Sequence, residues 1–191
     1  MQRVDETIKR PRVILEGDLG NCTLAVPTNW WESKQGNGTM ANADIIMVGP
    51  TETTLITELY NQVFAPKRDI AFFERRFKGR GNLLNLIAEV DNRPVGFLSG
   101  FELKPSTWFN WLVGVLPDFR RMGIASQLCE AEQAWARDQG YHHVRMECHN
   151  QHRPVLQMLI RQNFDIVGLR FDSDRQNNLV VFEKEIGLLD D

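Results

Sequence analysis

Cysteine is scarce in this chain, and its three residues, Cys22, Cys129 and Cys148, stand far apart. The number is odd and no Cys-x-x-Cys pair occurs, so the sequence predicts neither a disulfide framework nor a zinc site, and no metal is expected. Unpaired cysteines are typical of a reducing compartment, and we therefore expect a cytoplasmic protein.

The chain also lacks long apolar runs and an excess of basic residues. No run approaches the roughly 20 apolar residues that span a bilayer. The polar residues 1–12 lack the apolar segment of a secretory signal, so none is expected. The 22 Lys and Arg residues against 25 Asp and Glu residues give a formal net charge of −3. These features predict a protein that binds neither membranes nor nucleic acid.

What the chain does contain is enough apolar material for one globular domain. Its 191 residues are 42% hydrophobic and 25% charged, which favours a single core. Residues 1–43 include a polar Gly- and Asn-rich stretch and are predicted to be an N-terminal extension, with a hairpin that turns at 18–20. Residues 44–191 are the predicted main domain.

Hydrophobic periodicity predicts a regular order of elements from residue 44 onward: strand, two helices, three strands, helix, strand, helix and two strands. Two helices are expected within 51–79, a third between Ile124 and Gly140, and a fourth between Pro154 and Asn163. The predicted strands are 44–48, 83–90, 95–103, 108–116, 142–148, 164–172 and 177–186.

The segment LVGVLPDFRRMGIAS, residues 112–126, leads from a predicted strand directly into a helix. It is neither a P-loop, which needs Gly-Lys-Ser/Thr, nor a dinucleotide loop, which needs a glycine where Arg121 stands. Small residues at Gly123 and Ala125 leave the backbone uncovered. The first N–H groups of a helix lack intrahelical partners and carry partial positive charge. The turn therefore predicts an anion site suited to a pyrophosphate.

With Arg120-x-x-Gly123-x-Ala125 following Val115-Leu116-Pro117, this segment resembles motif A of the Gcn5-related N-acetyltransferases (GNAT), whose pattern is [QR]-x-x-G-x-[GA] after a strand that ends in V-x-P. The resemblance extends to the order of elements over roughly residues 44–187. It implies an α+β, three-layer fold, in which helices flank a mixed, mostly antiparallel central sheet. In such a fold strands 108–116 and 142–148 splay apart and form a wedge for acetyl-coenzyme A.

The resemblance also implies which residues contact the cofactor. The backbone of the strand before the loop pairs with the pantetheine arm, and Val113, Gly114 and Val115 stand at those positions. Of the neighbouring Arg120 and Arg121, at least one is expected to face a phosphate, and the resemblance does not indicate which. The residues expected around the pyrophosphate are Arg120, Arg121, Met122, Gly123, Ile124, Ala125 and Ser126.

Acetyl transfer needs a neutral amine, whereas a free lysine-like amine has a pKa of about 10.4. Family members often use a glutamate on a central strand as the base, but the strand before the loop has no carboxylate. Glu102 ends the preceding strand, and Gly100 on the same face predicts room for a substrate, so Glu102 is the predicted base. His149 is the second catalytic candidate, because imidazole titrates near neutral pH. Glu147 lies on the following strand.

The sequence departs from the family at the usual proton donor, a tyrosine in the last helix. Leu159 stands at that position, and His152 stands where the family has an asparagine. Asn150 is the nearest substitute for that asparagine and is expected to contact the cofactor. We predict an acetyl-CoA-dependent N-acetyltransferase that acts by direct attack of a primary amine, on a small molecule or a protein. The missing tyrosine leaves open a non-catalytic acyl-CoA-binding module, or a purely structural domain. The N-terminal extension is expected either to cover the acceptor pocket or to form a homodimer contact.

Overall fold

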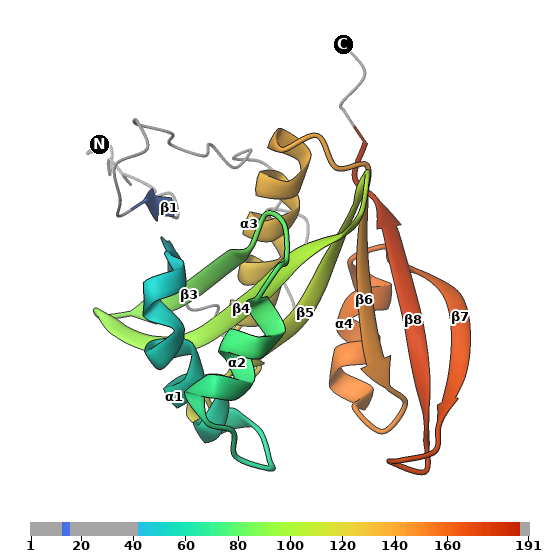
Figure 1. Ribbon diagram of the computed structural model, residues 1–191, viewed down its shortest axis with the longest axis horizontal. Coiled ribbons are helices and arrows are strands. Elements are labelled where there is room, and N and C mark those ends of the chain that lie inside the picture. Colours follow the sequence, from blue (N-terminus) through green and yellow to red (C-terminus); the bar gives the residue numbers. More distant parts are fainter. Residues whose placement is uncertain (1–12, 16–41, 188–191) are drawn as a thin grey trace, which may run out of the picture.

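The computed structural model describes residues 13–15 and 42–187, and within them eight strands form one sheet in the order β1-β2-β3-β4-β5-β6-β8-β7 (Figure 1). Neighbouring strands are antiparallel except for two parallel pairs, β1–β2 and β5–β6. The hairpin expected at 18–20 lies outside the described residues. The strands are β1 Val13–Leu15, β2 Asp44–Val48, β3 Leu84–Val90, β4 Arg93–Lys104, β5 Thr107–Val115, β6 His143–His149, β7 Asp165–Asp172 and β8 Asn177–Glu185.

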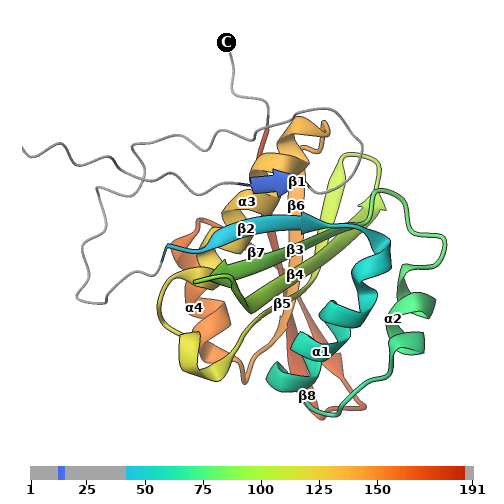
Figure 2. The same ribbon diagram turned by 90° about the vertical axis from the view of Figure 1, so that its left-hand side faces the viewer.

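Helices cover both faces of the sheet (Figure 2). Helices α1 (Thr53–Val63) and α2 (Ile70–Phe77) lie on one face, and α3 (Ile124–Asp138) and α4 (Arg153–Arg161) lie on the other. Short 3-10 turns at Pro50–Glu52 and Pro117–Phe119 precede α1 and α3. The predicted fold class and the predicted order of elements from residue 44 onward are confirmed.

The two core layers differ in how much of the sheet they cover. The layer beneath α3 and α4 draws buried side chains from both halves of the sheet, for example Leu98, Val144 and Phe182. The layer beneath α1 and α2 is built around Phe73 and Phe97, and its described members come from no strand beyond β5. On that face no helix among the described residues covers β6, β7 and β8, and their side chains there include the partly exposed Glu147 as well as the buried Leu179 and Val181.

A fully buried carboxyl group joins α3 to β5. Glu132 accepts a hydrogen bond from Nε1 of Trp108 at 2.8 Å and another from Nδ2 of Asn110 at 2.6 Å. Burial disfavours the charged form and raises the pKa of Glu132 to about 8, although both hydrogen bonds oppose the shift. The side chain therefore holds a proton at neutral pH, and a glutamine at this position would be neutral at every pH.

Replacing Glu132 with glutamine is expected to flatten the dependence of stability on pH. Between the ordinary pKa of 4.5 and the folded-state value of about 8, the folded protein binds more protons here than the unfolded chain does. Stability from this group is complete below pH 4.5 and is lost as pH rises toward 8. Urea unfolding at several pH values should show that the stability of the variant changes less than that of the wild type between pH 4.5 and pH 8.

The matched control for this prediction is Asp138→Asn, which removes an exposed carboxylate from the same helix. That variant should keep the wild-type slope of stability against pH. A Glu132→Gln variant with the same slope as wild type would show that Glu132 ionises normally in the folded protein.

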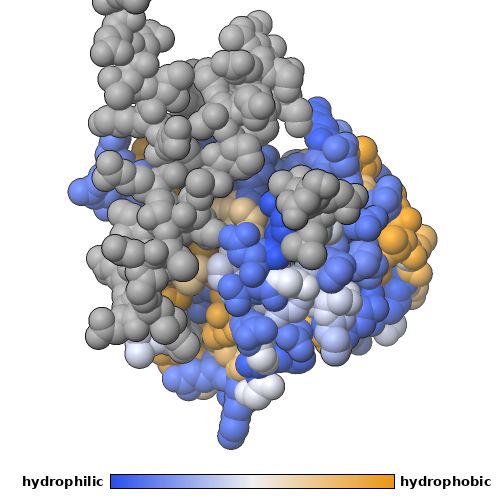
Figure 3. All heavy atoms as spheres, turned by 90° about the horizontal axis from the view of Figure 1, so that it is seen from above, coloured by the Kyte–Doolittle hydropathy of each residue, from blue (hydrophilic) through white to orange (hydrophobic). Residues whose placement is uncertain are grey.

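The outer strand β7 is an exposed edge with an apolar character. Its exposed apolar side chains are Ile166, Val167, Leu169 and Phe171, and an apolar area lies on this side of the molecule in Figure 3. Unpaired strand edges of this kind can pair with another chain. The homodimer expected from the sequence nevertheless stays a prediction.

Candidate active site

The two parallel strands in the middle of the sheet pair over only part of their length. The β5–β6 register runs from Thr107↔His143 to Asn110↔Met146. Residues 111–115 of β5 and 147–149 of β6 continue beyond it, and the two strands diverge there (Figure 1). This divergence is the wedge that the sequence predicted, and it lies at the carboxyl ends of both strands.

A bulge in β5 lies where the strands separate. The register between β4 and β5 steps from Gly100↔Asn110 to Ser99↔Leu112, which leaves Trp111 without a partner on β4. Both Trp111 and Leu112 consequently pack on the same face, against the cluster beneath α1 and α2. A bulge also increases the local twist of its strand, so it turns the end of β5 away from β6.

Beyond the bulge, β5 presents backbone groups to the wedge. The N–H of Leu116 donates to the carbonyl of Val95 on β4 at 2.8 Å. Hydrogen bonding alternates along an antiparallel strand, so Val113 and Val115 turn their N–H and C=O groups away from β4. The Val115 carbonyl accepts a hydrogen bond from Nε of Arg120 at 3.1 Å, as expected for a group on the free edge.

The side chains of the same three residues pack into the protein. Val113 and Val115 belong to the core beneath α3. A Cβ atom at Gly114 would lie 2.7 Å from the ring of Phe97 and 3.1 Å from that of Phe64, so only glycine fits there. The side chains of this part of the strand are therefore packed inside, and backbone groups of Val113 and Val115 lie on its free edge. The pantetheine contacts expected from the sequence stay a prediction.

Helix α3 begins without a side-chain cap. Its N-cap residue, Gly123, is left-handed with φ +82°, and Arg121 before it has φ +65°. The first intrahelical bond joins the N–H of Gln127 to the carbonyl of Gly123 at 3.1 Å. The N–H groups of residues 124–126 have no intrahelical acceptor, and the helix dipole adds partial positive charge. The turn is thus a cradle of main-chain donors.

The side chains around this cradle divide into two groups. Ile124 is buried and Met122 packs against the same core, so these two residues offer only their backbone. Arg120 and Arg121 are exposed at the turn, and Nε of Arg120 bonds to Val115. Asn150 follows the end of β6, across the wedge, where its N–H donates to the carbonyl of Asn178 at 2.8 Å.

Glu102 lies away from the wedge. It stands opposite Trp108, where β5 and β6 are still paired, and its Oε2 accepts hydrogen bonds from the hydroxyl of Tyr141 at 2.8 Å and from Asn82 at 3.2 Å. The expectation that Gly100 leaves room for a substrate is wrong. A Cβ atom there would lie 2.8 Å from the Trp108 ring, which fills that space. The geometry lends no support to Glu102 as the base.

His149 is the last residue of β6 and lies beside the wedge. Its Nε2 is 2.9 Å from Oδ2 of Asp172, the last residue of β7. This hydrogen bond lowers the pKa of the Asp172 carboxyl. The ring of His152 lies 6.3 Å away, centre to centre, and burial lowers the pKa of His152. His149 and Asp172 therefore form a hydrogen-bonded pair at the open end of the strand.

Glu147 is the first residue of β6 beyond the paired region. Its Oε1 lies 3.1 Å from Arg145 and its Oε2 lies 3.9 Å from Arg170 on β7. Arg145 also contacts Glu183 of β8 at 3.4 Å. These side chains occupy the face that α1 and α2 leave uncovered. Sequence reasoning missed this charged surface, although the alternation of buried and partly exposed residues along His143–His149 marks one face of β6 as polar.

The usual tyrosine position and the buried thiol are both turned into the core. Leu159 lies on α4 and is fully buried in the core, so an apolar side chain fills the place of the family's proton donor. Burial raises the pKa of the Cys148 thiol to about 11, which keeps it protonated. Cys148 lies on the face of β6 that packs beneath α3 and α4, opposite to Glu147.

A mixed sheet with one diverging parallel pair beside an uncapped helix defines the N-acetyltransferase fold, and solved structures share it. The E. coli ribosomal-protein-S18-alanine N-acetyltransferase has a TM-score of 0.68 at 14% identity, over 78% of this chain and 97% of that one. Ard1 from Thermoplasma volcanium has a TM-score of 0.63 at 20% identity, with coverages of 75% and 97%. The putative acetyltransferase yncA from Salmonella typhimurium, solved with acetyl-CoA, has 0.62 at 18% identity, with 79% and 98%.

The sequence profile of the acetyltransferase (GNAT) family matches residues 53–164. The chain therefore belongs to the GNAT family, and the resemblance noted in the sequence is confirmed. Comparison with curated protein sequences gave no match. No helix in the described part of the chain is long and apolar enough to cross a membrane.

Proposed function

We propose that this protein transfers the acetyl group of acetyl-CoA to a primary amine by direct attack. Membership of the GNAT family supports acetyl-CoA as the donor, and yncA was solved with that cofactor. One observation carries the proposal for this chain: the free edge of β5 leads directly to the uncapped N-terminus of α3. A long ligand with an amide-containing arm and a diphosphate fits that combination.

The residues that bind the cofactor would act through their main chain. Val113 and Val115 have backbone groups on the free edge of β5 and would pair with the amides of the pantetheine arm. The N–H groups of residues 124–126 would hold the pyrophosphate, and the exposed Arg121 would add positive charge. The divergence of β6 from β5 leaves a place for the arm between the two strands.

The chemistry requires a donor for the developing oxyanion and an acceptor for the amine proton. The N–H of Val113, preorganised on the rigid strand, is the proposed oxyanion donor. Glu147 is the proposed base, because it stands where the strands part and faces the uncovered side of the sheet. Its ion pairs with Arg145 and Arg170 hold the carboxylate in place. His149 is the proposed second group for proton transfer.

A non-catalytic acyl-CoA-binding module is the second candidate function. The observation in its favour is the fully buried Leu159 at the position of the family's usual proton donor. Such a module would retain the wedge and the α3 cradle and lack turnover.

Thiol release separates these candidates. The protein should bind coenzyme A in a calorimeter and should release free thiol when acetyl-CoA and a panel of amines are added together. Binding without thiol release for any amine would support the module. Absence of coenzyme A binding would overturn both candidates.

A further inference from the structure

Two arginine side chains are stacked on aromatic rings beside the point where β5 and β6 separate. The guanidinium carbon of Arg76, on α2, lies 5.0 Å from the ring centre of Trp111 and 5.3 Å from that of Phe101. That of Arg80 lies 4.6 Å from the same Phe101 ring. Stacking of this kind fixes the position of a guanidinium group. The two positive charges are therefore held close together over one aromatic floor.

Neither of these arginines forms an ion pair with a carboxylate among the described residues. Nε of Arg76 is buried and has no hydrogen-bond partner there. Burial lowers the pKa of Arg76, and the charge of Arg80 lowers it further, whereas Glu147 opposes the shift. Arg76 thus lies within electrostatic reach of Glu147, although the ion pairs of that carboxylate are with Arg145 and Arg170.

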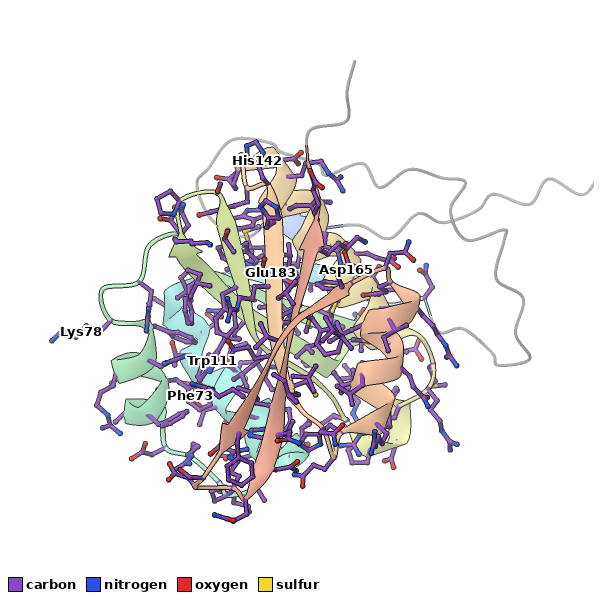
Figure 4. The ribbon with its side chains drawn as sticks, turned by 90° about the vertical axis from the view of Figure 1, so that its right-hand side faces the viewer. Phe73, Lys78, Trp111, His142, Asp165 and Glu183 are labelled. Atoms are coloured by element: carbon purple, nitrogen blue, oxygen red, sulfur yellow. The ribbon has the colours of Figure 1, made fainter. Side chains whose placement is uncertain are left out.

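The wider surface has more guanidinium groups than carboxylates. The guanidinium groups are those of Arg76, Arg80, Arg145 and Arg170, and the carboxylates among them are those of Glu147 and Glu183. Asp165 lies opposite Glu183 in the β7–β8 register and adds a third carboxylate at the far edge. Trp111, Glu183 and Asp165 follow one another across the molecule in Figure 4, with Trp111 beside Phe73 of α2. The unneutralised charge therefore lies at the Trp111 end, beside the wedge.

We propose that the acceptor is an amine that also carries an anionic group, and that Arg76 and Arg80 bind this group while the amine lies toward Glu147. This inference rests on the proposed function for the role of the amine. A carboxylate or a phosphate would relieve the repulsion between the two guanidinium groups, and both match the planar fork of arginine. Because the arginines stack over Trp111 and Phe101, close to the end of the β5–β6 pairing, the anion and the amine of such an acceptor lie close together.

Calorimetry on the protein saturated with coenzyme A tests this inference without requiring turnover. The probes are amino acids of increasing chain length, their uncharged amides, and phosphoethanolamine paired with ethanolamine. At least one anionic probe should bind about tenfold or more tightly than its neutral partner, the effect of one charge-assisted pair. The carboxylate and phosphate arms identify which anion is preferred.

The variants Arg76→Gln and Arg80→Gln should each lose this preference while binding of coenzyme A is unchanged. Arg75→Gln, an exposed arginine on the same helix, is the matched control and should retain it. Equal affinity for every charged and neutral pair, or a preference that both variants keep, would overturn the inference. Anion-dependent binding without thiol release would instead overturn the proposed function and leave the anion site standing.

Discussion

Replacing Gly123 with glutamate is expected to abolish coenzyme A binding. The new carboxylate would stand at the N-terminus of α3, where the main-chain donors and the helix dipole would hold the pyrophosphate. Each charge-assisted hydrogen bond contributes about 1.5–3 kcal/mol, so the loss of two should weaken binding about a hundredfold or more. Calorimetric titration of coenzyme A into the wild type and the variant measures the difference.

Gly140→Glu is a close control for this substitution. Gly140 follows the other end of α3 with φ +81°, nearly the value of +82° at Gly123, so both variants incur the same backbone strain. A Cβ atom at Gly140 meets nothing within 4 Å, so the larger side chain fits there. The control should bind coenzyme A like the wild type. Unchanged affinity in Gly123→Glu would show that the turn is not the phosphate site, and with it the proposed cofactor site would fall.

Replacing Glu147 with glutamine is expected to reduce kcat about a hundredfold or more, because general-base catalysis contributes about 10²–10⁴-fold. Glutamine keeps the shape of the side chain and cannot accept the amine proton. The limb of the pH–rate profile that reports the base should disappear from the variant. Steady-state kinetics over a range of pH, together with calorimetry of coenzyme A, separates this loss from a loss of binding.

The variant Glu102→Gln tests the alternative that Glu102 is the base. If Glu102 were the base, its variant would show the large loss in kcat and the altered pH profile, and Glu147→Gln would be nearly as active as the wild type. Glutamine at 102 can still accept the hydrogen bond from Tyr141, so the fold is expected to persist in that variant. The two carboxylates lie on opposite faces of the sheet, and the pair of variants therefore decides which face receives the amine.

The geometry of the segment from β5 to α3 could be predicted from the sequence because it depends on local backbone conformation. A strand that ends at Pro117 and a helix that opens at Gly123 place unpartnered N–H groups at a known spot, whatever the surrounding side chains are. Helix and strand boundaries followed from periodicity for the same reason. Alternation along the strand also predicted that Glu102 and Gly100 share one face of β4, and in the structure both lie beside Trp108 of β5.

The catalytic and acceptor side chains could not be read in this way, because their roles depend on neighbours distant in the chain. Alternation could not reveal that the Trp108 ring fills the space beside Gly100. Likewise, Arg76 and Arg170 are 94 positions apart in the sequence (170 − 76). Both lie near Glu147 only because the sheet places β6 between β5, whose side chains pack against α2, and β8, which pairs with β7.

The sequence by itself determined the fold family, the order of elements and the uncapped start of α3, since each depends on short-range periodicity or on a glycine at a turn. The tertiary structure alone decided which carboxylate lies beside the wedge and which arginines are left without a carboxylate partner among the described residues. Those outcomes depend on the bulge in β5 and on the divergence of β6 from β5. They also depend on the layer beneath α1 and α2, whose described members come from no strand beyond β5. Packing brings distant side chains together, and no local pattern records it.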